Sequence, residues 1–291
     1  MNRFEGNPIL EPIEHHPWES SCVFNAAATM FGGRIHMLYR AMGEDKISRL
    51  GYASSKDGYR FDERLPTPVF EPAGPNEKYG CEDPRLTVLE GKCVMTYTAY
   101  GDIYQIGITT ISMDDFLNKR WDWGERIYPF PNVRNKNAVI FPCKINSRYL
   151  MCHRLDPDIY IAYSDDLRIW NGNEIVMRPR SGFWDCLKIG AACPPFELDK
   201  GWLLLYHGVD AKRTYRLGVA VLDKESPERV IYRSDEPILE PAENYECSGA
   251  VPNVVFSCGA VLLEDHLLVY YGGADTVICV ATFDLDEILP V

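Results

Sequence analysis

The sequence lacks long apolar runs and paired cysteines. No apolar segment approaches the roughly 18 residues that a membrane-spanning helix needs, and the N-terminal stretch NRFEGNP has no apolar core of the kind found in secretory signals. The ten cysteines stand singly, without the C-x-x-C spacing that is typical of zinc sites. We therefore expect mostly buried, reduced cysteines, no metal site, no membrane partner and a cytoplasmic location.

The chain is also short of positive charge. It has 30 Lys and Arg against 42 Asp and Glu, which gives a formal net charge of −12. Nucleic acids need a basic face on their partner, so we expect no nucleic acid to bind. An anionic ligand would have to be held by a local cluster of cationic side chains. With 46% apolar and 12% aromatic residues, the composition supports a large folded core.

Long amphipathic helices are missing too, whereas one proline-marked phrase recurs along the chain. It reads NPILEP at 7–12, TPVFEP at 67–72 and EPILEP at 236–241, with shorter echoes at 128–130 and 178–180. Five such units in 291 residues give about 58 residues each, which is the size of a four-stranded propeller blade. The repeat therefore predicts an all-β chain with five blades.

A hairpin is expected after each repeat of this phrase. The expected hairpins lie at 23–43, 82–101, 137–156, 190–210 and 251–275. The C-terminal segment 277–289 reads as a strand pair whose continuation is the N-terminal NPILEP. Pairing of the two chain ends would close the last blade and leave no open sheet edge. We therefore predict that residues 1–291 form a single domain, a five-bladed β-propeller.

Polar residues recur at matching places in these hairpins. Near the hairpin starts stand Asn25, Asp83, Asn137 and Asn253, with only Cys193 or Pro194 in the fourth copy, and the returning strands end at Arg40, Tyr100, Arg154, His207 and Asp275. A single Asn or Asp at a turn is often satisfied by nearby backbone. Charged residues that end apolar strands, however, are costly without a ligand or a partner. Because blades converge on one axis, the set predicts one concave site.

Short motifs along the chain resemble those of glycoside hydrolase family 130. They are GCEDPRLT (80–87), KNAVIFP (136–142), HR (153–154), WDCLKIGA (184–191), YHGV (206–209) and YYGGAD (270–275). This family contains β-mannoside phosphorylases and a few hydrolases. The resemblance implies an enzyme that cleaves a short β-1,2- or β-1,4-manno-oligosaccharide, or mannosyl-glucose, with inversion. Inorganic phosphate would be the co-substrate, α-mannose 1-phosphate the product, and no cofactor would be needed.

The resemblance also implies roles for individual residues. Asp83 of EDPR matches the general acid of the family. The positions that bind the sugar match Asn25, Arg40 and Asp275. The positions that bind phosphate match Lys136, Asn137, Arg154, Lys188, His207 and Tyr215. Many members of the family carry Arg where this chain has Lys136, so the charge is kept but the bidentate contact with phosphate is not.

The chemistry of a phosphorylase explains why such residues would be needed. An inverting hydrolase uses two carboxyl groups, whereas a phosphorylase needs only an acid together with cations that position phosphate. Lys136, Arg154, Lys188 and His207 fit this cationic role. As an acid, Asp83 has to hold a proton, and we expect burial and the neighbouring Glu82 to raise its pKa. Arg85 would lower that pKa if it pointed the same way.

Two other functions stay open at this stage. A β-mannosidase of the same family would use water and would need a base, for which Glu246 is the candidate. A non-catalytic glycan-binding propeller would keep aromatic and amide groups but has no need for an acid beside a cationic cluster. Linkage, acceptor, chain length and oligomeric state, including a homo-oligomer, are not decided by the sequence.

Overall fold

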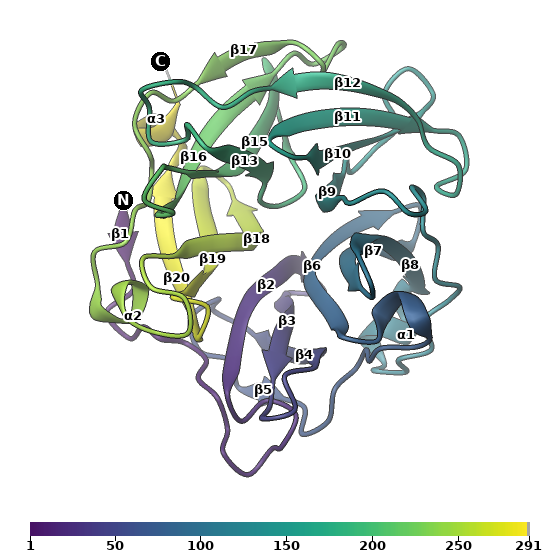
Figure 1. The fold of residues 1–291 in the computed structure, drawn as a ribbon, viewed down its shortest axis with the longest axis vertical. Coiled ribbons are helices and arrows are strands. Elements are labelled where there is room, and N and C mark those ends of the chain that lie inside the picture. The colour runs from purple at the N-terminus through teal and green to yellow at the C-terminus, as the bar shows by residue number, and fades with distance from the viewer. Residues whose placement is uncertain (290–291) are drawn as a thin grey trace.

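The structure of the protein is a computed structural model that describes residues 1–289, and nearly all of its regular structure is β-strand (Figure 1). The predicted all-β fold is confirmed. Within the described residues, the helical segments are short: η1 (Pro75–Glu77), α1 (Met113–Leu117), α2 (Asn244–Cys247) and α3 (Leu285–Ile288). The strands form four sheets, and none of these sheets closes on itself within residues 1–289.

The largest sheet contains the first two hairpins of the chain. Its strands are β2 (Cys22–Phe31), β3 (Arg34–Met42), β4 (Ser48–Ser55), β5 (Glu63–Arg64), β6 (Gly80–Leu89), β7 (Lys92–Tyr100) and β8 (Tyr104–Ser112). Strands β4 and β6 are joined only by the parallel pair of Ser48 and Gly80. All other neighbours in this sheet pair antiparallel. The sheet therefore consists of two antiparallel units, β2–β5 and β6–β8, that meet at one point.

The other three sheets are also antiparallel. One contains β9 (Lys136–Ile140), β10 (Tyr149–Leu155), β11 (Asp158–Ser164) and β12 (Asn171–Met177), and the next contains β13 (Lys188–Ala191), β14 (Phe196–Leu198), β15 (Gly201–Val209), β16 (Tyr215–Leu222) and β17 (Val230–Arg233). The last contains β18 (Val255–Leu263), β19 (His266–Gly273), β20 (Val277–Asp284) and β1 (Asn2–Arg3). The five expected hairpins are present as the pairs β2–β3, β6–β7, β9–β10, β13–β15 and β18–β19.

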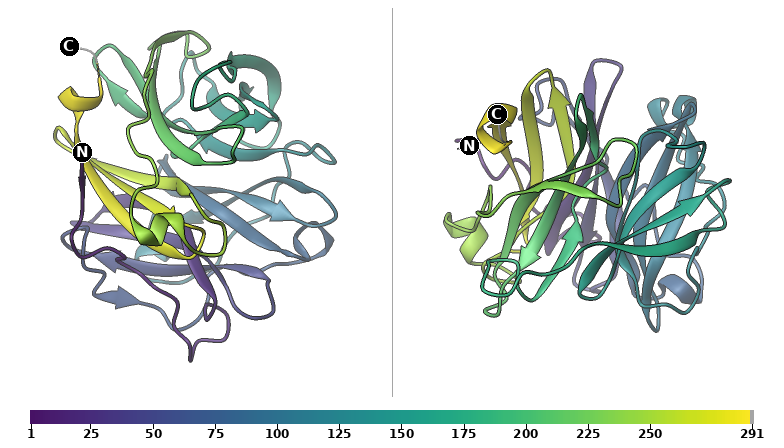
Figure 2. Two further views of the ribbon diagram at one scale, coloured as in Figure 1. Left: turned by 60° about the vertical axis from the view of Figure 1, so that its left-hand side comes forward. Right: turned by 90° about the horizontal axis from the view of Figure 1, so that it is seen from above.

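The two ends of the chain lie in the same sheet, as expected. Asn2 pairs with Thr282 and Arg3 with Ala281, and Leu10 forms a further bridge with Ile278. Figure 2 shows the purple N-terminal strand beside the yellow C-terminal strands at one edge of the molecule. The expectation of a second C-terminal strand was wrong, because residues 285–288 form α3 instead of a strand.

The sheets are arranged around a common centre. Figure 1 shows β2, β6, β9, β13 and β18 nearest to the middle. Strand β2 contacts β18 and β6, β9 contacts β6 and β13, and β18 contacts the sheet of β13 through β16. The apolar core lies between adjacent sheets, where Leu205 and Val219 pack with Val269 and Cys279. Strand β15 is buried along its whole length, which explains why GWLLLYHGV is a continuous apolar run instead of an alternating one.

Four of the five hairpins carry the same buried group, which we call the carboxylate clasp. In each clasp a fully buried carboxylate accepts hydrogen bonds from a tyrosine of the second hairpin strand and from an arginine. The clasps are Glu19 with Tyr39 and Arg64, Glu77 with Tyr97 and Arg126, Asp185 with Tyr206 and Arg233, and Glu246 with Tyr271 and Arg3. On β10 the corresponding place is taken by His153, which pairs with the neutral Asn135.

Candidate active site

A cavity of about 320 Å³ opens where the inner strands begin. Nine of the ten predicted site residues line it, namely Asn25, Arg40, Asp83, Lys136, Asn137, Arg154, Lys188, Tyr215 and Asp275. The tenth, His207, lies behind this lining, with its Nε2 atom 3.5 Å from Nη1 of Arg154. The structure thus brings together residues that are up to 250 positions apart (25 to 275) in the sequence.

The local backbone explains why Asn and Asp recur at this rim. Asn25, Asp83 and Asn137 have φ angles of 51°, 50° and 56°, in the left-handed region. Each follows a point where the pairing of its hairpin shifts register. Asn and Asp tolerate left-handed backbone better than other side chains with a β-carbon, and bulges commonly redirect side chains next to active sites. The three side chains therefore turn out of the sheets and into the cavity.

Other members of the expected ring are placed differently. Asn253 has the same backbone conformation but is exposed, and it contributes its carbonyl to the amide of Tyr215. Cys193 is buried in the core and Tyr100 does not line the cavity. The strand register puts Thr98 opposite Glu82, in the place that Arg40 takes opposite Phe24. Matching the hairpins by their ends was therefore wrong by two residues in this copy.

Asp83 lies in the interior of the cavity wall. Its Oδ1 atom accepts hydrogen bonds from Nδ2 of Asn25 at 2.9 Å and from Nη1 of Arg40 at 3.1 Å. Arg85 points away from this carboxylate and donates to the backbone oxygens of Ala192 and of Asp83 itself, at 2.9 and 2.8 Å. The side chain of Asp83 is only 7% exposed.

The expected rise in the pKa of Asp83 was wrong. Burial does raise this pKa, but the nearby cations Arg40, Lys136 and Arg85 outweigh burial and lower it to about 2. The protein alone therefore holds Asp83 as a carboxylate. Asp275, on the same cavity, behaves in the opposite way: burial raises its pKa to about 6, even though Arg40 opposes the rise.

The cationic side of the cavity is made by Lys136, Arg154 and Lys188. Arg154 is buried, and its Nε atom lies 2.7 Å from Oδ1 of Asp156. His207 does not add a fourth charge as expected. Burial lowers the pKa of His207 well below its usual range, and the cations around it, Arg154 first, lower it further. The imidazole is therefore neutral at pH 7.

Several buried polar atoms at this site have no partner within residues 1–289. They include Oδ1 of Asn25, Oδ1 of Asn137 and Nδ1 of His207. In native proteins nearly all buried polar atoms form a hydrogen bond, so an unpaired one indicates a missing partner such as a ligand or a water molecule. A polar ligand in the cavity would provide one for the two asparagines that line it.

Four further residues belong to the site but were not among the ten predicted ones, although Glu82 was expected to act on the pKa of Asp83. Glu82 bonds both Arg40 and Lys136, Asp156 pairs with Arg154, Tyr104 lies under the Lys136 ammonium at 4.4 Å, and the Phe256 ring lies 4.5 Å from that of His207. Glu82 is the first residue of the EDPR motif, and Asp156 follows the HR motif by two positions, so closeness to these motifs was the signal that could have found them. Phe256 carries no such signal.

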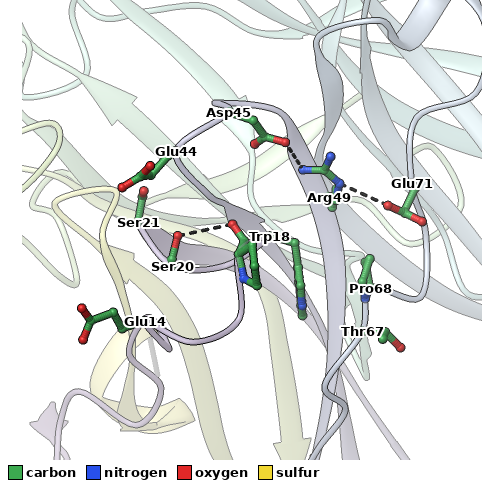
Figure 3. A pocket seen from close by; sticks show the side chains of 11 residues that line it. Glu14, Trp18, Ser20, Ser21, Glu44, Asp45, Arg49, Thr67, Pro68 and Glu71 are labelled. Carbon is green, nitrogen blue, oxygen red and sulfur yellow. Dashed lines mark hydrogen bonds and ion pairs between the residues drawn. The ribbon is translucent and has the colours of Figure 1, made fainter.

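A larger hollow of about 720 Å³ lies beside the turn between β3 and β4 (Figure 3). Trp18 in this hollow stacks on Tyr39 and donates to the oxygen of Pro66, and Trp184 makes the same two contacts with Tyr206 and Asp235. Trp18 is therefore a packing residue of the repeat. Arg49 is already paired with two carboxylates. None of the unpaired buried atoms within residues 1–289 belongs to this hollow, so we take the central cavity as the candidate site.

Other kinds of site were also considered. Within residues 1–289, no group of three or more His, Cys, Asp or Glu is placed to hold a metal ion. No helix of this part of the chain is long and apolar enough to cross a membrane. Seven of the ten cysteines are buried, and none of the ten forms a disulfide.

An all-β chain with a carboxylate between cations in one central cavity matches a class of carbohydrate-active enzyme. A family model described as beta-1,4-mannooligosaccharide phosphorylase matches residues 1–291, and the chain belongs to glycoside hydrolase family 130. It is 42% identical to the 1,2-beta-oligomannan phosphorylase and 45% identical to the Beta-1,2-mannobiose phosphorylase of Thermoanaerobacter sp. (strain X514). Each match covers 99% of this chain and 98% of the relative.

A solved structure supports the same grouping. The Beta-1,2-Mannobiose phosphorylase from Listeria innocua, in complex with beta-1,2-mannobiose, superposes with a TM-score of 0.87 at 27% identity. This match covers 99% of our chain and 97% of the other. The family expected from the short motifs is therefore confirmed over the whole chain.

Proposed function

We propose that this protein is an inverting phosphorylase that cleaves β-1,2-linked manno-oligosaccharides and releases α-mannose 1-phosphate. The observation that carries the proposal is the cationic group of Lys136, Arg154 and Lys188, which shares one cavity with the buried carboxylate of Asp83. The chain has a net charge of −12, so a local cluster of cations in one cavity indicates a site that binds an anion.

The linkage follows from the relatives. The two Thermoanaerobacter proteins at 42% and 45% identity are named for β-1,2-mannosides, and so is the Listeria innocua structure. The description of the family model names β-1,4-linked oligosaccharides instead. We give the relatives more weight because they are single proteins at 42% and 45% identity over 99% of this chain, whereas the family model describes many members at once.

In the proposed reaction, Asn25, Arg40 and Asp275 hold the mannosyl unit. The cations Lys136, Arg154 and Lys188 position inorganic phosphate, with Asn137 and Tyr215 as hydrogen-bonding partners and the neutral His207 behind Arg154. A phosphate oxygen attacks C1, the bond from C1 to the bridging oxygen breaks, and that oxygen takes the proton of Asp83. The single displacement inverts the anomeric carbon. Phosphate needs no base, because it is already a nucleophile.

Asp83 has to be protonated to act as an acid, although Arg40, Lys136 and Arg85 lower its pKa. The negative charge of bound phosphate explains how this is possible. Without phosphate in the cavity, Lys136 and Arg40 keep Asp83 ionised. A phosphate ion next to Lys136 offsets part of this positive charge and so raises the pKa of Asp83. Binding of the nucleophile therefore helps to protonate the acid.

The two alternatives are less well supported. Glu246, the candidate base of a hydrolase, is fully buried in a clasp with Arg3 and Tyr271 and does not line the cavity. Asp156 does line it, but it is paired with Arg154. A glycan-binding protein without catalysis would not need an acid among cations.

The proposal has two further parts. We propose that the two units of the largest sheet and the three other sheets are five blades of a propeller, supported by the single pair that joins β4 to β6. We also propose a cytoplasmic location, which the ten free cysteines favour.

The test is an incubation with β-1,2-mannobiose, with and without phosphate, followed by ³¹P and ¹H NMR. We expect α-mannose 1-phosphate only in the presence of phosphate, and slower cleavage of β-1,4-mannobiose and mannosyl-glucose. Free mannose as the sole product in either buffer would instead indicate a hydrolase. Binding of mannobiose without cleavage would indicate a glycan-binding protein.

A further inference from the structure

The side chain of Glu82 joins two cations that the proposed reaction uses for different substrates. Nη2 of Arg40 donates to its Oε1 atom at 2.7 Å, and Nζ of Lys136 donates to its Oε2 atom at 3.1 Å. Both oxygens of this carboxylate are therefore engaged by a cation. The Glu82 side chain is only 7% exposed, so solvent screens these ion pairs little.

Glu82 does not line the cavity, whereas both of its partners do. Arg40 divides its guanidinium between Glu82 and Asp83, with Nη1 at 3.1 Å from Oδ1 of Asp83. Its third nitrogen, Nε, donates to the hydroxyl of Ser48 at 2.9 Å. Each donor group of Arg40 thus has a fixed partner, and Glu82 supplies one of them.

We propose that Glu82 is a positioning residue of the phosphorylase reaction, which holds Arg40 and Lys136 at Asp83 and offsets their positive charge. It touches neither substrate and acts only through these two cations. The inference rests on the proposed function, since it assumes that Lys136 binds phosphate and that Asp83 is the acid.

Removing this charge has two opposite consequences. Lys136 would be free of its carboxylate partner and would attract phosphate more strongly. The same uncompensated cations would also hold Asp83 more firmly as a carboxylate and so weaken it as an acid. The charged groups around Asp83 that enter this balance are Arg40, Glu82, Arg85, Lys136, Arg154 and Asp275.

The decisive variant is Glu82→Gln, which keeps the shape of the side chain and removes its charge. We expect the KM for phosphate to fall several-fold while kcat falls roughly tenfold. The alkaline limb of the pH profile of kcat, which reports the acid in the complex with bound substrates, should move to lower pH by about one unit. A site that is merely damaged would bind phosphate more weakly, so the fall in KM distinguishes the two cases.

Glu82→Asp serves as the second variant, and it decides the question alone should Glu82→Gln not fold. It keeps the charge but is shorter and cannot reach both cations. We expect kcat to fall several-fold with the alkaline limb unmoved. An unchanged kcat would overturn the positioning role.

Glu77→Gln is the matched control. Glu77 is also fully buried and paired with an arginine, Arg126, but it lies outside the cavity. We expect it to lower the melting temperature and to leave both KM values and the pH limb unchanged. If Glu82→Gln behaves like this control, Glu82 is structural and the inference is wrong. If the wild-type enzyme shows no dependence on phosphate, the proposed function fails first, whatever Glu82 does.

Discussion

Asp83 shows how the chemistry of one residue depends on charges that come from other strands. Its partners Asn25 and Arg40 lie on β2 and β3, and Lys136 begins β9. Replacing Asp83 by Asn keeps the size and one acceptor of the side chain but removes the proton that the leaving oxygen needs. We expect turnover of β-1,2-mannobiose to fall by about 10²- to 10⁴-fold, with the fold unchanged but the melting temperature lowered, because Arg40 loses a buried carboxylate partner. Retention of more than a tenth of the activity would place the acid elsewhere.

Asp275 allows a prediction about pH. Its pKa rises from 3.8 to about 6 in the folded protein, so the folded state holds this proton more tightly than the unfolded chain does. The resulting stability is fully present below pH 4 and is lost as the pH rises through about 6, where the half-buried carboxylate ionises. A shift of this size corresponds to roughly 3 kcal/mol.

Asp275→Asn should therefore stabilise the protein at pH 8 and have little effect at pH 4. Denaturant unfolding at the two pH values measures the difference. The same variant should turn over mannobiose more slowly, since Asp275 is proposed to bind the sugar. Equal effects on stability at both pH values would show that the carboxylate is not penalised by burial.

At the scale of single elements, the carboxylate clasps explain what holds three of the hairpins to an outer strand, because Arg64, Arg233 and Arg3 lie on β5, β17 and β1. The clasp at Glu246 is also the one that ties β1 to the rest of the last sheet, because Nε of Arg3 donates to Glu246 at 2.8 Å. Glu246→Gln would leave a partly buried arginine without its carboxylate. Breaking a buried ion pair in this way typically costs about 3–5 kcal/mol.

The clasp prediction has a built-in comparison. Asn135→Ala removes the neutral partner of His153, for which we expect a loss of about 1 kcal/mol. The free energy of unfolding of both variants, measured by urea denaturation, should therefore differ by at least about 2 kcal/mol. Glu246→Gln should leave kcat unchanged, which would also remove Glu246 as a hydrolytic base. Similar losses in the two variants would contradict the clasp as an ionic device.

The same elements show what could be read from the sequence and what could not. The proline-marked repeat predicted the hairpins, and matching positions in it predicted Asn25, Asp83 and Asn137, whose backbone is left-handed. The cavity residues Lys136, Lys188 and Tyr215 were instead implied only by the resemblance to the family. The direction of Arg85 was not, since its hydrogen bonds go to the oxygens of Ala191 and Ala192, more than 100 residues away. Without that direction, and without the contact of Arg40 with Asp83, the sign of the pKa shift of Asp83 could not be derived.

For the molecule as a whole, β20 lies between β19 and β1 and completes the last sheet. Its residues Ile278, Val280 and Phe283 are at most 1% exposed. Burying a side chain of this kind contributes about 1.5–3 kcal/mol, so the three together approach the 5–15 kcal/mol by which a typical domain is stable. Deletion of residues 277–291 should make the protein insoluble or lower its melting temperature strongly. An unchanged melting temperature would mean that the segment is dispensable and would remove the fifth blade.

A circular permutant tests the same closure without removing any residue. The N-terminal amine of Met1 lies 2.6 Å from the carboxylate of Glu287, so a short Gly/Ser linker can join the two ends. The new termini are best placed between Asn132 and Val133, which are exposed and lie between β8 and β9. The exposed Gly74 is less suitable, because the adjacent Ala73 amide donates to the clasp residue Glu77.

We expect the permutant to fold, to melt within a few degrees of the wild type and to keep its activity, since the opened loop contributes nothing to the cavity. Loss of folding in the permutant would show that the order of the chain ends, and not only their pairing, is needed to close the last sheet.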